Sequence, residues 1–139
     1  MTTFVDTNIV IYLLDPQSDH HQWSVDDLVK AKANGPVVVP DIAYCELSIA
    51  MPDKAATDRA IESLALDRLS CTDESFFRAG RAYKKYKDEN RGTKSNVLPD
   101  FLIGAQAETA QAPLITANSK DFVGYFAKLN LISPPQTTS

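Results

Sequence analysis

The sequence predicts one α/β domain with a central, mostly parallel sheet, and three observations support this. Short apolar runs of strand-like composition alternate with helical segments along the chain, as in strand–helix–strand units. The run Val37–Val39 is apolar at every position, which is typical of a strand covered on both faces. The chain has 139 residues, 44% of them hydrophobic, which is enough for one domain with a core of its own.

The first half of the chain is expected to contain two strands and four helices. Pro16 ends the first helix, and Gly35 follows the second as a C-cap signal. Asp41 is the expected N-cap of the third helix, which Pro52 ends. The strands are expected over residues 3–5 and 37–39, and the helices over 9–14, 23–33, 41–51 and 54–66.

The second half is expected to contain three strands and three helices. Thr72 and Asp73 can cap a long helix, and Pro99 suits the first turn of the next one. The strands are expected over residues 69–71, 113–116 and 129–132, and the helices over 74–90, 100–110 and 121–126. We assign residues 1–134 to a single domain and expect residues 135–139 to form a frayed polar tail.

Composition argues against several classes of protein. The longest apolar run, Ile9–Leu14, is far shorter than the ~20 residues of a membrane span, so no membrane association is expected. The N-terminus lacks the basic and apolar regions of a signal peptide, which predicts a cytoplasmic protein. Cys45 and Cys71 have neither the number nor the spacing of a disulfide framework or a zinc finger.

The charge is distributed unevenly along the chain. The net charge is −4, but residues 78–94 hold seven of the fourteen basic residues against two acidic ones, a net +5. The rest of the chain has seven basic and sixteen acidic residues, a net −9. A function must explain both the acidic majority and the concentrated basic stretch.

Three aspartates stand at the ends of predicted elements. Asp6 follows the first strand, Asp100 opens a helix, and Asp121 follows the fourth strand. Each alone could simply stabilise a helix N-terminus. Because ligands bind beyond the carboxyl ends of parallel strands, we expect these side chains to gather at one edge of the sheet.

Glu46 is the most informative acidic residue. In a helix that begins at Asp41, it lies four residues after Ile42 and three before Ile49, so we expect it to share their buried face. A buried carboxylate without a partner is costly, and Lys32 is the only basic residue between positions 31 and 53. An ion pair remains one explanation, but a metal or a functional pocket is the better one.

Carboxylates gathered at one point repel one another, and a hard divalent cation removes that repulsion. Mg²⁺ binds oxygen ligands, usually one or two carboxylates together with waters and phosphate oxygens. An acidic cluster beside a basic stretch therefore fits a phosphodiester substrate, with the cation on the scissile phosphate and basic side chains on the flanking backbone.

An ordered set of motifs resembles the PIN-domain nucleases, most closely the VapC-type toxins of bacterial toxin–antitoxin pairs. The matching segments are Phe4–Leu14, Cys45–Leu47, Leu98–Ala107 and Leu114–Phe122. The resemblance implies a three-layer α/β/α sandwich and a Mg²⁺-dependent endoribonuclease, with Mn²⁺ as a substitute. It also implies a homodimer and a cognate antitoxin that blocks the acidic pocket.

The resemblance carries over to particular residues. Asp6, Glu46 and Asp100 match the first three acidic positions of the family, and Asp121 is the only carboxylate in the last motif. Asp6 and Asp100 are expected to bind the cation directly, and Glu46 and Asp121 directly or through water. Four polar residues are expected to support them: Thr7, Asn8, Thr116 and Asn118. Many members carry an acidic residue where this chain has Asn118, which leaves the role of Asp121 open.

The long helix over residues 74–90 carries basic side chains at helical spacing. Arg78, Arg81 and Lys85 are expected to face solvent, opposite an apolar stripe of Phe76, Tyr83 and Tyr86. One interpretation is a solvated face. The other is that this stripe, with Arg91 and Lys94 on the following loop, holds the RNA backbone.

Three other functions remain as alternatives. A PIN scaffold could bind RNA without cutting it, although the four acidic residues argue against this. A phosphatase of the haloacid-dehalogenase type needs an aspartate two residues after Asp6, where this chain has Asn8. A receiver domain needs its acceptor aspartate after the third strand, where Asp73 lacks the usual following loop and Glu46 would have no role.

Overall fold

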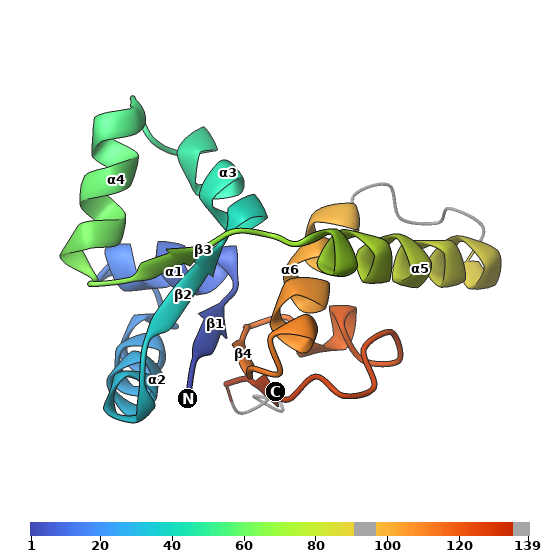
Figure 1. Ribbon diagram of the computed structural model, residues 1–139. Helices are drawn as coiled ribbons and strands as arrows, with labels where there is room; N and C mark the ends of the chain where they lie inside the picture. The colour runs from blue at the N-terminus through green and yellow to red at the C-terminus, as the bar shows by residue number, and fades with distance from the viewer. Residues whose placement is uncertain (91–96, 135–139) are drawn as a thin grey trace.

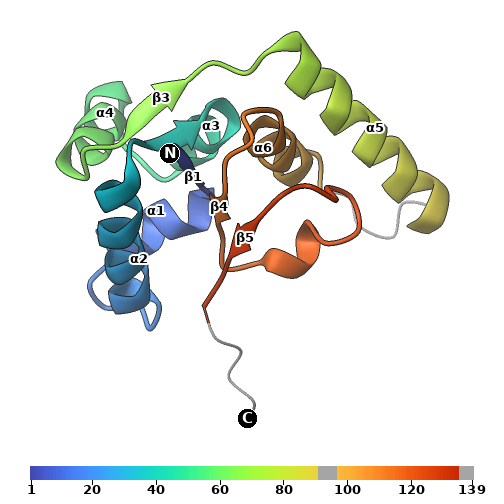
Figure 2. The same ribbon diagram turned by 60° about the horizontal axis from the view of Figure 1, so that its bottom comes forward.

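The central element of the fold is a five-stranded parallel sheet with the strand order β3-β2-β1-β4-β5 (Figures 1 and 2). It is seen in a computed structural model, which describes residues 1–90 and 97–134. The strands are β1 (Thr3–Val5), β2 (Val37–Pro40), β3 (Asp67–Leu69), β4 (Leu114–Ile115) and β5 (Leu131–Ile132). The predicted α/β class with a parallel sheet is confirmed.

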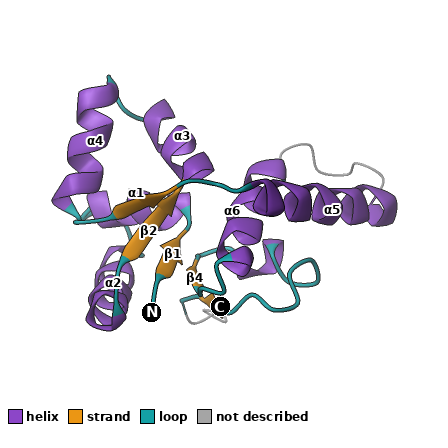
Figure 3. Cartoon of the chain, viewed as in Figure 1, coloured by secondary structure: helices purple, strands orange, loops and turns teal. Residues whose placement is uncertain are grey.

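Helices cover both faces of the sheet, which gives three layers (Figures 1 and 3). The helices α1 and α2 lie on one face, and α6 lies on the other. The α-helices are α1 (Thr7–Leu14), α2 (His21–Asn34), α3 (Asp41–Ile49), α4 (Lys54–Ser63), α5 (Asp73–Asn90) and α6 (Leu98–Thr109), and a 3₁₀ turn covers Ser119–Asp121. No helix in the described part of the chain is long and apolar enough to cross a membrane.

The strand β1 lies in the middle of the sheet because its side chains are apolar on both faces. Phe4 and Val5 are completely buried, and β1 pairs with β2 on one side and β4 on the other. The chain then leaves the sheet at Asp6, whose carboxylate accepts a hydrogen bond from the Thr7 amide and starts α1. The carboxyl end of the central strand thus delivers an acidic residue to the edge of the sheet.

The helices α5 and α6 pack against each other through aromatic side chains. Tyr83 and Tyr86 contact the ring of Phe101 with centroids 6.2 and 5.8 Å apart. Gly104 lets the 122–126 loop approach α6, because a Cβ there would lie 2.7 Å from the ring of Phe126. This packing positions the basic helix α5 beside the loop that follows Asp121.

Three local predictions differ from the structure. The third strand is Asp67–Leu69 rather than residues 69–71. Asp41 is the first residue of α3 and does not cap it, because its carboxylate instead accepts from Arg68 and from the Cys71 amide. The predicted helix over 121–126 is a 3₁₀ turn over residues 119–121.

The apolar stripe of α5 is also shifted. Phe76 is 53% exposed, and Ala79, Ala82 and Tyr86 form the buried side. The small alanines allow α5 to lie close to α6, so the larger Phe76 is displaced to the margin. The predicted tail, residues 135–139, lies outside the described residues.

Candidate functional site

The carboxylate of Asp6 forms the centre of a hydrogen-bonded group at the carboxyl edge of the sheet. It is only 4% exposed. Its Oδ1 accepts from the Thr7 amide at 2.7 Å, and its Oδ2 accepts from the Thr116 hydroxyl at 2.7 Å. Thr116 directly follows β4, so the group joins the carboxyl ends of two adjacent strands. Two donors thus fix both oxygens of a buried carboxylate.

Glu46 is joined to this group through Thr7. The Thr7 hydroxyl donates to Glu46 Oε1 at 2.8 Å, so one threonine touches both acidic residues, by its amide and by its hydroxyl. These partners are 39 residues apart in sequence, which ties the start of α1 to the middle of α3. The predicted gathering of Asp6 and Glu46 is therefore present in the structure.

The reason that the sequence suggested for the position of Glu46 is wrong. Ile49, expected on the buried face, is 82% exposed, and Cys45 is also exposed. Ala43 and Leu47 make the buried contacts of α3. Because α3 rests on small and leucine side chains at this other face, Glu46 lies half-buried at the margin, where Thr7 can reach it.

The electrostatics of Asp6 show a carboxylate that is held among like charges. Burial raises the pKa of Asp6 above its usual value of 3.8, and the hydrogen bonds from Thr116 and Thr7 oppose this shift. The negative charges of Glu46 and Asp121 raise the same pKa further. Glu46 and Asp121 therefore both lie within electrostatic reach of Asp6.

Asp121 and the start of α6, which carries Asp100, lie on different elements at the same edge. Asp121 ends the 3₁₀ turn that follows β4 and is half-buried. Asp100 is half-buried in the first turn of α6. Since α6 runs back across the sheet before β4, its N-terminus points toward the carboxyl edge of the parallel strands and its C-terminus toward the amino edge.

The polar residues predicted to support the acidic group have different surroundings. Thr7 and Thr116 are hydrogen-bonded to the carboxylates. The Asn118 amide donates to Thr116 Oγ1, while its side chain is exposed. Asn8 Oδ1 is buried and has no hydrogen-bond partner in the part of the chain that the structure describes. This amide oxygen, beside Thr7, is a buried acceptor that a ligand could satisfy.

The donor set fits a hard divalent cation that retains part of its water. Residues 1–90 and 97–134 contain no group of three or more His, Cys, Asp or Glu side chains arranged to hold an ion. Mg²⁺ and Mn²⁺ need fewer, because Mg²⁺ commonly binds one or two carboxylates and keeps several waters.

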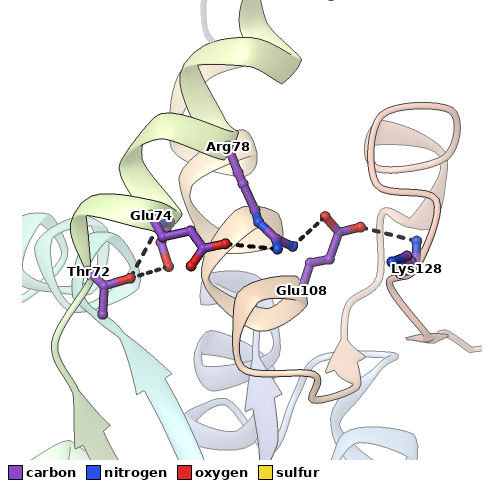
Figure 4. Close-up of polar contacts among 6 residues, drawn as sticks. Thr72, Glu74, Arg78, Glu108 and Lys128 are labelled. Atoms are coloured by element: carbon purple, nitrogen blue, oxygen red, sulfur yellow. Dashed lines mark hydrogen bonds and ion pairs between the residues drawn. The ribbon is translucent and has the colours of Figure 1, made fainter.

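The basic residues of α5 are not equivalent. Arg78 is half-buried and lies between two carboxylates (Figure 4). Its guanidinium nitrogens lie 3.0 Å from Glu74 Oε1 and 3.2 Å from Glu108 Oε1. This arginine was expected to face solvent as part of the basic stripe. Arg81 is exposed, and Lys85 is exposed and donates to the Gly124 carbonyl at 2.8 Å.

Glu108, which no sequence pattern singled out, explains the position of Arg78. Its other oxygen accepts from the Lys128 amide at 3.1 Å, so this one carboxylate joins α5, α6 and the segment before β5 (Figure 4). The signal in the sequence that could have identified Glu108 is an acidic residue near the end of a largely apolar helix. The other two predicted RNA-binding residues, Arg91 and Lys94, lie outside the described residues.

Comparisons with known proteins agree on one family. The model of the PIN domain matches residues 3–125. A chain of VapBC-1 from nontypeable Haemophilus influenzae is similar with a TM-score of 0.71 and 24% identity, covering 96% of this chain and 98% of that one. A chain of VapBC2 from Rickettsia felis, bound to a DNA fragment from its promoter, has a TM-score of 0.70 and 21% identity. That match covers 96% of this chain and 98% of that one.

A third structure is more distant. VapC20 from Mycobacterium tuberculosis, described as a Sarcin-Ricin loop cleaving toxin, has a TM-score of 0.59 and 14% identity, covering 94% of this chain and 99% of that one. No curated protein matches this chain.

Proposed function

This chain belongs to the PIN-domain family, and on that premise we propose that it is a metal-dependent endoribonuclease, the toxin of a type II toxin–antitoxin module. The observation that carries the proposal is the Asp6 carboxylate, which is hydrogen-bonded by Thr116 and whose pKa is raised chiefly by burial and further by the negative charges of Glu46 and Asp121. A site that holds like charges together in this way has the electrostatics of an ion-binding site.

Each residue at the edge has a role in this proposal. Thr116 and the Thr7 amide hold both oxygens of Asp6 in one orientation, and the Thr7 hydroxyl does the same for Glu46. Asp6 and Asp100 bind Mg²⁺, and Glu46 and Asp121 complete its surroundings. When bound, the cation lowers the pKa of an attacking water and stabilises charge on the phosphate. The hydrogen-bonded group consists of threonines and carboxylates, so the acidic residues carry the chemistry.

Partners follow from the similar structures. Two of them are VapBC structures, and one is described as a Sarcin-Ricin loop cleaving toxin. We therefore propose RNA as the substrate, a cognate antitoxin as the inhibitor, a homodimer as the assembly and the cytoplasm as the location. The negative charge gathered at the carboxyl edge would attract a basic segment of the antitoxin as well as a cation.

The test is incubation of the purified chain, free of antitoxin, with total RNA in Mg²⁺ and in a chelator, followed by mapping of the product ends. We expect discrete cleavage in Mg²⁺ and none in the chelator. RNA binding without any cleavage would contradict the nuclease and would favour a non-catalytic RNA-binding scaffold.

A further inference from the structure

A groove of about 320 Å³ runs along α5. Its walls come from α5, the end of α6 and the loop at residues 125–126. Phe77, Arg81 and Lys85 line it from α5, and Tyr125 lines it from the loop. It therefore combines exposed cations with aromatic rings within one concave surface.

The cations of the groove are placed against aromatic faces. The Arg81 guanidinium lies 5.0 Å from the centroid of Phe77, and the Lys85 ammonium lies 5.6 Å from that of Tyr125. Phe77 is 63% exposed, so its ring keeps a large accessible surface beside the guanidinium. A phenylalanine this exposed on a charged helix adds little to the stability of the core, because most of its apolar surface stays in water.

The charge balance of the groove favours an anionic ligand. Its acidic wall residue, Glu108, is already paired with Arg78 and with the Lys128 amide. Arg81 has no ion pair with any residue in the described ranges, 1–90 and 97–134. Lys85 uses one donor on the Gly124 carbonyl and lies 4.0 Å from Glu89, which leaves it further donors. Net positive charge thus remains for a ligand.

The groove is connected to the acidic edge through one aromatic cluster. The ring centroid of Tyr125 lies 5.1 Å from that of Phe101 and 6.0 Å from that of Tyr86. Phe101 directly follows Asp100, and Tyr125 follows Asp121 by four residues. The Tyr125 end of the groove therefore lies beside the start of α6, while its other end lies at Arg78 and Glu108 near the end of that helix.

From this arrangement we propose that the groove binds an unpaired stretch of the RNA substrate, with a base stacked on Phe77 and phosphates held by Arg81 and Lys85. This inference rests on the proposed ribonuclease function. Aromatic faces interleaved with cations bind single strands, because every base has a face to stack and every nucleotide a phosphate. A base inside a duplex cannot reach Phe77, so the substrate class is single-stranded or looped RNA.

The chain offers matched controls for each part of the groove. Phe76 is the adjacent residue on the same helix, is 53% exposed, and lines a different pocket with Ile42 and Leu102. Lys84 is an exposed cation on the same helix that pairs with Asp88 and does not line the groove. Phe76→Ala and Lys84→Gln therefore remove an aromatic ring and a positive charge from α5 without altering the residues that line the groove.

The experiment measures binding of a labelled single-stranded RNA oligonucleotide to the full chain by fluorescence anisotropy, with Asp100→Asn as the background and a chelator present. Phe77→Ala should weaken binding by about 5- to 150-fold at an unchanged salt slope, as expected when one base can no longer stack. Arg81→Gln should flatten the salt slope by about 0.7 for each phosphate that it no longer neutralises. Phe76→Ala and Lys84→Gln should bind like the background, and an RNA duplex should bind more weakly than the single strand.

Equal effects of Phe77→Ala and Phe76→Ala, or equal affinity for duplex and single strand, would overturn the groove assignment. Because binding is measured without cleavage, these results are separate from the ribonuclease proposal. Cleavage by the wild-type chain with no change in Phe77→Ala would contradict only the groove. Loss of binding in Phe77→Ala, in a chain that never cleaves RNA, would contradict only the nuclease.

Discussion

The charged side chains at the two ends of the parallel sheet are arranged differently. At the carboxyl edge, Asp6 is buried close enough to Glu46 and Asp121 for their charges to raise its pKa. At the other end of α6, Arg78 lies between the carboxylates of Glu74 and Glu108 (Figure 4). One cluster gathers like charges, and the other alternates opposite charges.

This difference distinguishes a candidate ligand-binding site from a structural contact. The Arg78 cluster satisfies its charges internally and joins three segments of the chain, so it has no need of a ligand. In the Asp6 group the hydrogen bonds are satisfied, but the acidic residues still repel one another. Hydrogen bonds that fix the carboxylate, together with the repulsion that remains, are the features on which we base the proposed cation site at the carboxyl edge.

The largest expected effect is on catalysis. Asp6→Asn keeps the shape and the N-cap but removes one charge of the proposed ion site. We expect the rate of RNA cleavage to fall by about 100-fold or more. Replacing a residue that only hydrogen-bonds to a metal ligand already lowers activity by about 10- to 100-fold. Glu74→Gln, at the structural cluster but outside the groove, should cleave at the wild-type rate when folded. Wild-type cleavage by Asp6→Asn would remove the distinction between the two clusters.

The next effect concerns the donor that fixes Asp6. Thr116→Val leaves Asp6 Oδ2 buried without a donor, which should lower the free energy of unfolding by about 1–3 kcal/mol at neutral pH. Thr57 is the matched control, because it is also completely buried but donates to a neutral carbonyl of Asp53. Urea unfolding of both variants should show the smaller loss for Thr57→Val, and equal losses would argue against a charged acceptor at Asp6.

A smaller effect is expected where opposite charges are paired. Glu108→Gln should lower the free energy of unfolding by about 1 kcal/mol, because its pair with Arg78 is only partly exposed. The exposed pair of Lys84 and Asp88 should contribute less than about 0.5 kcal/mol, which Lys84→Gln measures. If thermal unfolding ranked these two variants in the reverse order, Glu108 would not be the anchor that we describe.

The smallest effect is a dependence on pH. A raised pKa means that the folded metal-free chain binds the Asp6 proton more tightly than the unfolded chain does. Its contribution to stability is therefore complete below the usual pKa of 3.8 and is lost as the pH rises through the higher folded pKa. Relative to Asp6→Asn, the wild-type chain in a chelator should lose stability with rising pH, and an opposite slope would contradict the raised pKa of the buried Asp6 carboxyl.

Much of the fold could be predicted because local signals and long-range packing agree. Apolar runs such as Phe4–Val5 and Val37–Val39 have no stable place except inside a covered sheet, and they form its central strands. The third strand was predicted two residues too late because Asp67–Leu69 is exposed on the sheet edge, where side-chain pattern says little.

The candidate site could be predicted in part for the same reason. Asp6 stands where the central strand ends, and sequence places it there directly. The face of Glu46 could not be derived from Ile42 and Ile49, because Ile49 is exposed and only the tertiary contact with Thr7 shows where Glu46 lies. Likewise, helical spacing cannot show that Arg78 meets Glu108, its partner 30 residues away.

The most direct test of the central claim is the melting temperature of the chain as Mg²⁺ is added, for wild type and Asp6→Asn. Binding to the folded state alone raises the melting temperature with ligand concentration. We predict that the wild type has the lower melting temperature in a chelator and that this temperature rises as Mg²⁺ is added. The melting temperature of Asp6→Asn should be higher in the chelator and should not change with Mg²⁺. An equal rise in both proteins, or none in wild type, would contradict a cation site at the carboxyl edge.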